Sequence, residues 1–282
     1  GAGVGQPWRD LRKLLRKQQI RPAGTTVLFV VAPAVVAGSA LLVAAALPLV
    51  TTASPLDPAA DLFAVVGVLL IGTVALALAG LDTGTAFGGM GASRGMTVAA
   101  LVEPTLLMAM FALSVPAGST NLGAIVSAGA ADPWRAISPS AVLALAALMV
   151  AILAEAGRLP VDNPATHLEL TMIHEAMVLE YAGPRLAIME WAGGMRLTVL
   201  LALLANLLLP FGVAGAAAGI GAVLLAAGLI AVKVTVLAAA LAAVEVFVAK
   251  LRLFRVPELL AGSFVLALLA VTAAFFLTGS GV

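Results

Sequence analysis

Ionisable side chains within apolar stretches are the residues of this sequence that packing alone explains least well. Six of them lie inside, or at the ends of, long runs with few other charges: Glu103, Glu155, Glu190, Arg196, Lys233 and Glu245. A charge at the centre of a bilayer costs about 2.5–3.5 kcal/mol even on lenient insertion scales, so such residues commonly have a function. A connected row of them is typical of a proton relay, whereas pairing with an opposite charge is the structural alternative.

The depth of these residues in their stretches separates them into two groups. Glu155, Glu190 and Arg196 lie near the ends, where an ion pair or the membrane interface explains them equally well. Glu103 and Lys233 lie deeper and favour a role in proton transfer. Lys233 and Glu245 are about 18 Å apart along one helix, so each needs a partner on another helix or water.

The segment from residue 157 to 183 holds both histidines of the chain and a group of acids. Its candidate residues are Arg158, Asp162, His167, Glu169, His174, Glu175 and Glu180. Asn163 followed by Pro164 is typical of a helix start, which predicts a helix running to Tyr181. On that helix Glu169 and Glu180 share one face, and His167 and His174 share another.

A metal or cofactor site is not favoured by this segment or by the rest of the sequence. Two histidines seven residues apart do not make a metal site, and "HEAMV" lacks the second histidine of the HExxH zinc motif. The absence of cysteine excludes thiolate zinc sites and iron–sulfur clusters held by this chain. We therefore expect no cofactor or metal here, and any redox metal must lie in a partner.

A glycine-rich string, "GTAFGGMGAS" at residues 84–93, precedes Arg94. It follows no strand, so neither a Rossmann loop nor a phosphate-binding loop is credible. We predict a turn beside the membrane.

The elements that position all these residues are membrane-spanning helices. The chain has 282 residues, of which 62% are hydrophobic and only 10% charged, with a mean hydropathy of +1.15. This composition excludes a soluble globule and predicts an all-α, polytopic transmembrane protein. The expected spans, within a single membrane domain, are residues 25–50, 62–81, 96–115, 138–155, 184–209, 222–248 and 258–277.

Seven spans place the two ends of the chain on opposite sides, which the distribution of basic residues can orient. If the basic segment 1–24 is cytoplasmic, that side receives almost all Lys and Arg of the loops, and the other side receives Arg135 alone. The segment 157–183 is then cytoplasmic too.

The basic segment also suggests binding partners. A net charge of +1 does not favour nucleic acid. The six basic residues of segment 1–24 suit either anionic lipid or an acidic protein surface. We expect this segment and the Asp162 region to contact a soluble subunit.

Four stretches carry a family resemblance: "QPWRDLRKLLRKQQIRP", "GLDTGTAFGGMGASRGMTVAALVEPTLL", "AEAGRLPVDNPATHLELTMIHEAMVLEYAGP" and "AKLRLFRVPELL". They resemble the membrane subunit of group 4 energy-converting nickel–iron hydrogenases, of the formate hydrogenlyase subunit 4 or hydrogenase-4 component C type. These proteins are homologous to the H-type membrane subunit of NADH-quinone oxidoreductase. The alanine-rich spans are similar to those of actinobacterial, mycobacterium-like members.

The resemblance implies a role within a larger complex in the bacterial cell membrane. It implies an eighth span before Gly1, docking of hydrogenase-like large and small iron–sulfur subunits, and antiporter-like membrane subunits alongside. Iron–sulfur clusters, and nickel and iron in hydrogenase members, would lie in those partners. The positions matching the family's proton channel and docking loop are Glu103, Glu155, Arg158, Asp162, Glu169 and Glu180, with Arg94 in the preceding cytoplasmic loop.

Departures from the quinone-reducing relatives weaken a quinone site. Their pattern PFDxxExExEL has a phenylalanine where Val161 stands, and acids where Ala165 and His167 stand. His174 and Glu175, in a stretch about three residues longer than in those relatives, are candidates to compensate. A quinone-binding subunit and a passive membrane anchor remain the alternatives, and an independent transporter lacks the expected internal repeat.

Overall fold

The structure is a computed structural model that describes residues 3, 5–52, 54, 56–162, 172–215, 218–252 and 255–279. The first half of the chain forms α1 (Gln6–Arg16), α2 (Val27–Ala46), α3 (Leu62–Asp82), α4 (Ala86–Ala117) and α5 (Leu122–Ala131). The second half forms α6 (Pro139–Glu155), α7 (His174–Val178), α8 (Pro184–Leu208), α9 (Ile220–Phe247) and α10 (Val256–Gly279). The predicted all-α membrane fold is confirmed, because six of the described helices are long and apolar enough to cross a membrane.

Each of the seven predicted spans overlaps one of these helices. The exception in length is α6, which has 17 residues and falls just short of the usual spanning length. Several helices begin where a side-chain oxygen accepts a hydrogen bond from a backbone N–H of the first turn, which satisfies one of the unpaired donors there. These caps are Thr26, Asp61, Thr85, Asn121 and Ser138.

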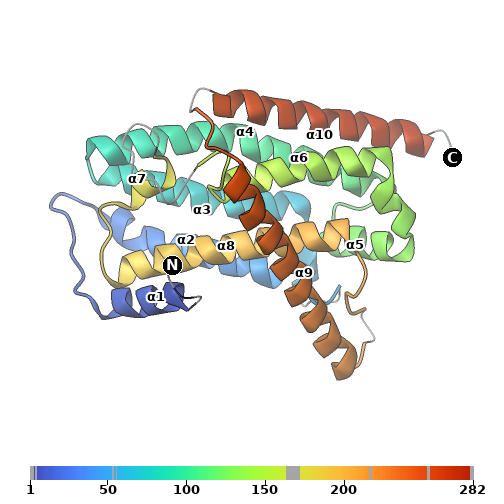
Figure 1. Cartoon of the computed structure of the whole chain (residues 1–282), viewed down its shortest axis with the longest axis horizontal. Helices are drawn as coiled ribbons and strands as arrows, with labels where there is room; N and C mark the ends of the chain where they lie inside the picture. The colour runs from blue at the N-terminus through green and yellow to red at the C-terminus, as the bar shows by residue number, and fades with distance from the viewer. Residues whose placement is uncertain are drawn as a thin grey trace.

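The helices pack as a bundle in which α4 is central. It contacts α3, α6 and α10, while α8 packs beside α2. α9 differs from the others because it crosses the bundle obliquely (Figure 1) and packs mainly on α8. Its most apolar window is only 11% buried, so most of its surface is left for lipid or another subunit.

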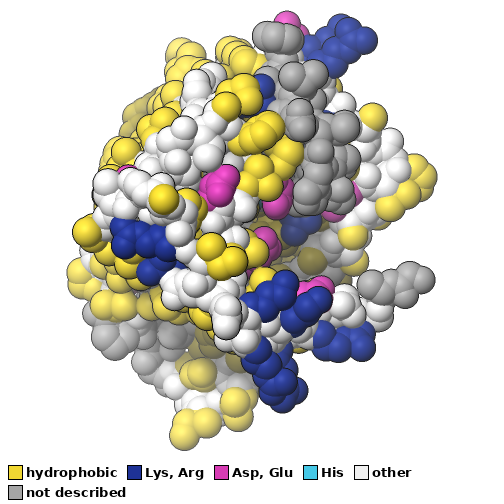
Figure 2. Space-filling view, turned by 90° about the vertical axis from the view of Figure 1, so that its left-hand side faces the viewer, with side chains coloured by type: hydrophobic (Ala, Val, Ile, Leu, Met, Phe, Trp, Pro, Cys, Tyr) yellow, Lys and Arg dark blue, Asp and Glu magenta, His cyan; other side chains and the backbone are white. Residues whose placement is uncertain are grey.

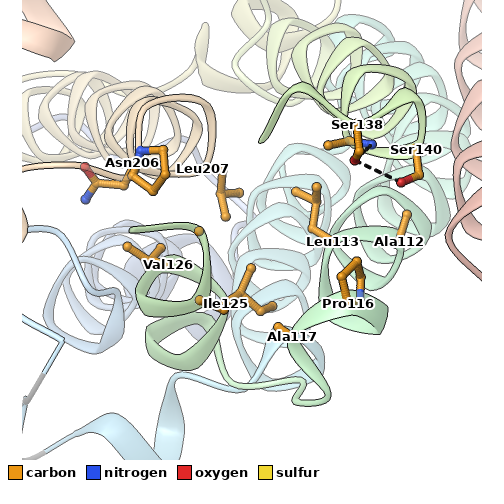
Figure 3. A pocket seen from close by; sticks show the side chains of 14 residues that line it. Ala112, Leu113, Pro116, Ala117, Ile125, Val126, Ser138, Ser140, Asn206 and Leu207 are labelled. Atoms are coloured by element: carbon orange, nitrogen blue, oxygen red, sulfur yellow. Dashed lines mark hydrogen bonds between the residues drawn. The ribbon is translucent and has the colours of Figure 1, made fainter. Parts of the chain in front are cut away.

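The two ends of the bundle differ in character. At one end, which we call the α7 end, lie α1, α7 and the starts of α4 and α8 (Figure 1). At the other, the α5 end, lie α5, the start of α6 and the end of α8. A pocket of about 50 Å³ at the α5 end is lined mainly by apolar side chains, with the hydroxyl oxygens of Ser138 and Ser140 3.2 Å apart (Figure 3). A pocket of this volume has room for a few water molecules.

The glycine string corrects the prediction of a turn at residues 84–93. Only residues 83–85 form the turn, and the remaining glycines lie in the first turns of α4. A Cβ on Gly88 would lie 2.2 Å from the carbonyl oxygen of Gly80, and one on Gly91 would lie 2.9 Å from Cβ of Ala176. The glycines therefore let α4 approach α3 and α7 closely. The sequence alone did not show that these glycines lie in helix contacts.

The predicted continuous helix from Asn163 to Tyr181 is wrong in its described part. Met172 and Ile173 are not helical, and α7 ends at Val178. Contacts from elsewhere hold this backbone. Nη1 of Arg94 donates to the Met172 carbonyl (3.1 Å), and the His174 N–H donates to Oδ2 of Asp162 (3.2 Å).

His167 and Glu169 lie outside the described residues. Glu180 lies in the turn after α7. It is therefore not on a helix, and the helical face that we predicted it to share with Glu169 is absent at this residue.

Candidate functional site

A cavity of about 250 Å³ opens at the α7 end of the bundle. Its walls come from α2, α3, α4, α6 and α8 and from residues 156–162 and 173–177. Seven ionisable residues line it: Glu155, Arg158, Asp162, His174, Glu175, Glu190 and Arg196. Figure 2 views the molecule from this end and shows carboxylates around a hollow, with Lys and Arg side chains gathered around it.

Arg196 on α8 is the central cation of this cavity. Its Nη2 forms an ion pair with Oε1 of Glu155, donates to the carbonyl of Leu69 (2.9 Å), and donates to Oγ1 of Thr73 (2.7 Å). The side chains of Arg196 and Glu155 are only 13% and 4% exposed. One guanidinium thus connects α3, α6 and α8 and compensates a buried carboxylate.

Glu103 on α4 is a buried carboxylate close to the inner wall of the cavity. Gly95 and Ala99 line the cavity, and Glu103 follows Ala99 by one helical turn on the same face. The residue is 6% exposed, and neither carboxylate oxygen has a hydrogen-bond partner among the described residues. Arg196 is a positive charge that acts on it.

A buried carboxylate without a hydrogen-bond partner is costly. This makes Glu103 the strongest candidate in the described part of the chain for a group that exchanges a proton.

The first part of the 157–183 segment is tied to the end of α9. Nζ of Lys250 lies 2.7 Å from Oδ1 of Asp162, and Nη1 of Arg158 lies 3.8 Å from Oε1 of Glu245. The Leu251 N–H also donates to the Pro160 carbonyl (3.0 Å). The rim of the cavity is therefore held by residues that are about 90 positions away in the sequence.

The last part of the segment is tied to the start of α2. The phenol of Tyr181 is 3% exposed, stacks on Phe29 with ring centroids 4.0 Å apart, and donates to the Phe29 carbonyl (2.8 Å). Burial raises the pKa of this phenol above its usual value, so it remains a hydrogen-bond donor. Oδ2 of Asp82 accepts from the N–H groups of Thr26 and Phe29 and completes the junction.

The structure brings together most of the residues singled out in the sequence. Glu155, Arg158, Asp162, His174 and Glu175 share the cavity wall. Arg94 contacts the same segment through Met172, and Glu245 reaches it through Arg158. Glu180 does not line the cavity.

Lys233 lies away from the cavity, near the α5 end. Its Nζ donates to the carbonyls of Leu209 and Phe211 at 2.6 Å each and to Oδ1 of Asn206 at 3.3 Å. Asn206 in turn donates to the carbonyls of Pro48 and Leu49. The ammonium thus satisfies carbonyls just after the end of α8, where a helix leaves acceptors unpaired.

Arg196 and Glu190 belong to the cavity, although the sequence alone did not place them in the relay. Their charge inside a predicted span was the available signal. What the sequence lacked was the contact of α8 with α3 and α6, which brings Arg196 to Glu155, Leu69 and Thr73.

Among the described residues, no three His, Asp or Glu side chains group as metal ligands. The polar groups of the cavity instead suit proton exchange and the binding of small polar molecules.

Fold and site together define a multi-pass helical membrane protein with a charged cavity at one end of its bundle. Residues 1–276 match the model of the NADH dehydrogenase family. The chain belongs to that family.

Two relatives from Escherichia coli (strain K12) are similar over most of the chain. Hydrogenase-4 component C is 38% identical over 75% of this chain and 66% of its own length. Formate hydrogenlyase subunit 4 is 35% identical over 96% of this chain and 86% of its own length. A third relative, one of the H-type subunits of the NADH-quinone oxidoreductase of Geobacter sulfurreducens, is 32% identical over 65% of this chain and 57% of its own length.

A solved structure shares the fold. It is that of the membrane-bound sulfane sulfur reductase, an archaeal respiratory membrane complex, with a TM-score of 0.83, 18% sequence identity, and coverage of 97% of this chain and 88% of the other. The resemblance inferred from the sequence motifs is therefore confirmed at the level of the family and the fold.

Proposed function

We propose that this chain is the membrane-anchoring, proton-coupling subunit of a complex I-like assembly of the energy-converting hydrogenase or formate hydrogenlyase type. It holds no cofactor itself and links electron transfer in a soluble arm to proton translocation in the membrane. The names of the two E. coli relatives support the type of complex. The observation that carries the proton role is the unpartnered Glu103 one turn beyond the charged cavity.

The proposed proton path begins at the cavity and leads inward. Asp162, Glu175 and Glu155 supply carboxylates at its wall, and Arg196 pairs with Glu155 and acts as a positive charge on Glu103. A proton held by Glu103 changes the charge beside Arg196, which is also bonded to α3 and α6. Protonation is thereby coupled to contacts between helices. We include Glu169 in this path because of the family resemblance alone. Glu180, Lys233 and Glu245 do not line the cavity, so we assign them no role where the path begins.

The proposed partners follow from the same assignment. Hydrogenase-like large and small subunits, which hold the iron–sulfur clusters and in hydrogenases nickel and iron, dock at the α7 end. Antiporter-like membrane subunits lie alongside the bundle. The excess of basic residues at the α7 end supports a cytoplasmic position for it.

The test is Glu103→Gln in the complex purified with its partners. Glutamine keeps the shape of the side chain and removes the proton-carrying group. We expect the complex to assemble and its soluble arm to reduce an artificial acceptor at the normal rate. Proton translocation, followed with a pH-sensitive dye in proteoliposomes, should fall about ten-fold or more.

The matched control is Glu258→Gln, because Glu258 is an exposed glutamate in the first turn of α10 outside the cavity. This variant should pump normally. Normal pumping per electron in Glu103→Gln would favour the passive-anchor alternative and overturn the relay. Co-purification without any soluble redox subunit would overturn the assignment to such a complex.

A quinone-binding subunit is the second candidate, favoured by the identity to the NADH-quinone oxidoreductase relative from Geobacter sulfurreducens. The cavity has apolar walls from Val36, Met177 and Met189 next to its polar groups. A photoreactive quinone analogue should then label these residues in the assembled complex. Labelling elsewhere, or none, contradicts this candidate.

A further inference from the structure

Helix α1 (Gln6–Arg16) has two chemically distinct faces. Its basic face consists of Arg9, Arg12, Lys13 and Arg16, continued by Lys17 at the C-cap. At 3.6 residues per turn, these five side chains occupy an arc of about 140°. Its apolar face, on the remaining side, consists of Trp8, Leu11, Leu14 and Leu15.

The bundle covers only part of the apolar face. α1 packs beside the first part of α8 at the α7 end (Figure 1), with Leu11 and Leu14 half-buried. The contact is close where α1 ends, because a Cβ on Gly183 would lie 2.8 Å from the carbonyl oxygen of Gln18. Trp8 and Leu15 nevertheless remain 71% and 58% exposed.

The basic face is not neutralised within the described chain. Among the described residues, no carboxylate forms an ion pair with any of its five side chains, whereas Arg158, Arg196 and Lys250 are all paired. Asp10, the acid within α1, accepts a hydrogen bond from Nε2 of Gln6 (2.9 Å). Five cations therefore face outward without a counter-charge from the described part of the protein.

Trp8 and Leu15 lie along the edge where the apolar face meets the basic face. They are seven residues apart, so they are neighbours on one line along the helix, and Arg12 lies about 40° from Trp8 around the axis. A tryptophan and a leucine beside a row of Lys and Arg are typical of helices that lie in a membrane interface. An acidic protein surface would cover the cations and leave Trp8 and Leu15 in water.

We infer that α1 is an interfacial anchor that binds the headgroups of anionic phospholipids, with Trp8 and Leu15 inserted among the acyl chains. The cations contact the lipid phosphates, and the aliphatic parts of Arg and Lys lie along the apolar edge. The contact holds α1 against the start of α8, next to the cavity. This inference does not depend on the proposed proton role.

The test uses Trp8 as its own reporter in the full chain. Replacing Trp134 and Trp191 by Phe leaves Trp8 as the single tryptophan of the chain. The protein is reconstituted in vesicles of phosphatidylcholine with a minor share of phosphatidylglycerol, and bromine is carried on the acyl chains of one lipid or the other. We expect brominated phosphatidylglycerol to quench Trp8, per molecule, at least about two-fold more strongly than brominated phosphatidylcholine.

Two charge-reversal variants decide what causes that preference. R12E/K13E should abolish it, while R252E/R255E, which changes the charge equally at exposed sites outside α1, should retain it. Circular dichroism checks that both variants are folded. Equal quenching by the two lipids, or a preference that survives R12E/K13E, overturns the anionic site. No quenching by either lipid shows that protein covers Trp8 and overturns the anchor.

Discussion

Arg196 shows how a single residue can organise both the packing and the chemistry of this protein. Its side chain is only 13% exposed, is bonded to α3 and pairs with Glu155 on α6. It also acts as a positive charge on Glu103, the carboxylate that we propose exchanges a proton. Burying a charge is tolerable only when it is paired and hydrogen-bonded. Arg196 therefore stabilises the contact between α3, α6 and α8, and this contact also keeps its charge in the cavity.

Replacing Arg196 by Met tests this structural function. The variant leaves Glu155, whose side chain is 4% exposed, without its counter-charge. Loss of one partner of a buried ion pair costs about 3 kcal/mol or more. We expect a clearly lower midpoint of thermal unfolding in detergent, measured by scanning fluorimetry.

Two further variants serve as controls for Arg196→Met. Adding Glu155→Gln to it should recover part of the loss, because the uncompensated charge is then gone. Arg158→Met breaks a looser and more exposed pair with Glu245 and should cost no more than about 1 kcal/mol. Equal losses for the Arg196 and Arg158 variants would contradict this account.

At the scale of elements, the close approach of α3 and α4 depends on glycine at one specific position. A Cβ on Gly88 would meet the carbonyl of Gly80, whereas a Cβ on its neighbour Gly89 would meet no atom within 4 Å. Adjacent residues on a helix point about 100° apart, so only one of the two lies in the contact.

Gly88→Ala and Gly89→Ala are therefore a matched pair. Gly88→Ala should destabilise the protein, because its Cβ would lie 2.2 Å from backbone and forces α3 and α4 apart. Gly89→Ala should be neutral or stabilising by up to about 1 kcal/mol, from helix propensity. Thermal unfolding of the two variants measures the difference, and similar midpoints would show that the contact is not tight.

The oblique helix α9 illustrates a different way of fixing an element. It is lightly buried, so apolar packing alone leaves its tilt weakly determined. Polar contacts hold it instead: Lys233 binds carbonyls that follow α8, and near its C-terminal end Glu245 and Lys250 bind Arg158 and Asp162. The rim of the cavity and the tilt of α9 are therefore linked.

For the whole molecule, the decisive property is the direction in which it crosses the membrane. The chain contains no cysteine, so single cysteines can be introduced without background. With the α7 end cytoplasmic, Ser54→Cys and Ser119→Cys should react with an impermeant maleimide added to whole cells. Ser93→Cys, near the start of α4, should react only after permeabilisation. The reverse pattern would place the cavity and α1 on the outer side.

The sequence by itself determined the fold class and the family. Apolar runs predict spans because crossing a bilayer takes about 20 residues, and a helix pairs the backbone N–H and C=O groups that lipid cannot. The motifs around Asp82 and Asp162 carry the family resemblance, which the match over residues 1–276 confirms.

Only the tertiary structure decided how the segment after Asp162 folds and which charges meet. The helix start at Asn163 and Pro164 predicted one helix up to Tyr181. Arg94 and Asp162 instead bind the backbone at Met172 and His174, and the Phe29 carbonyl accepts from the Tyr181 hydroxyl. The same holds for Glu103, Glu155 and Arg196, which lie on α4, α6 and α8. A single sequence shows which residues share a face of one helix. How one helix is rotated against another, and which faces touch, depends on packing between residues far apart in the chain.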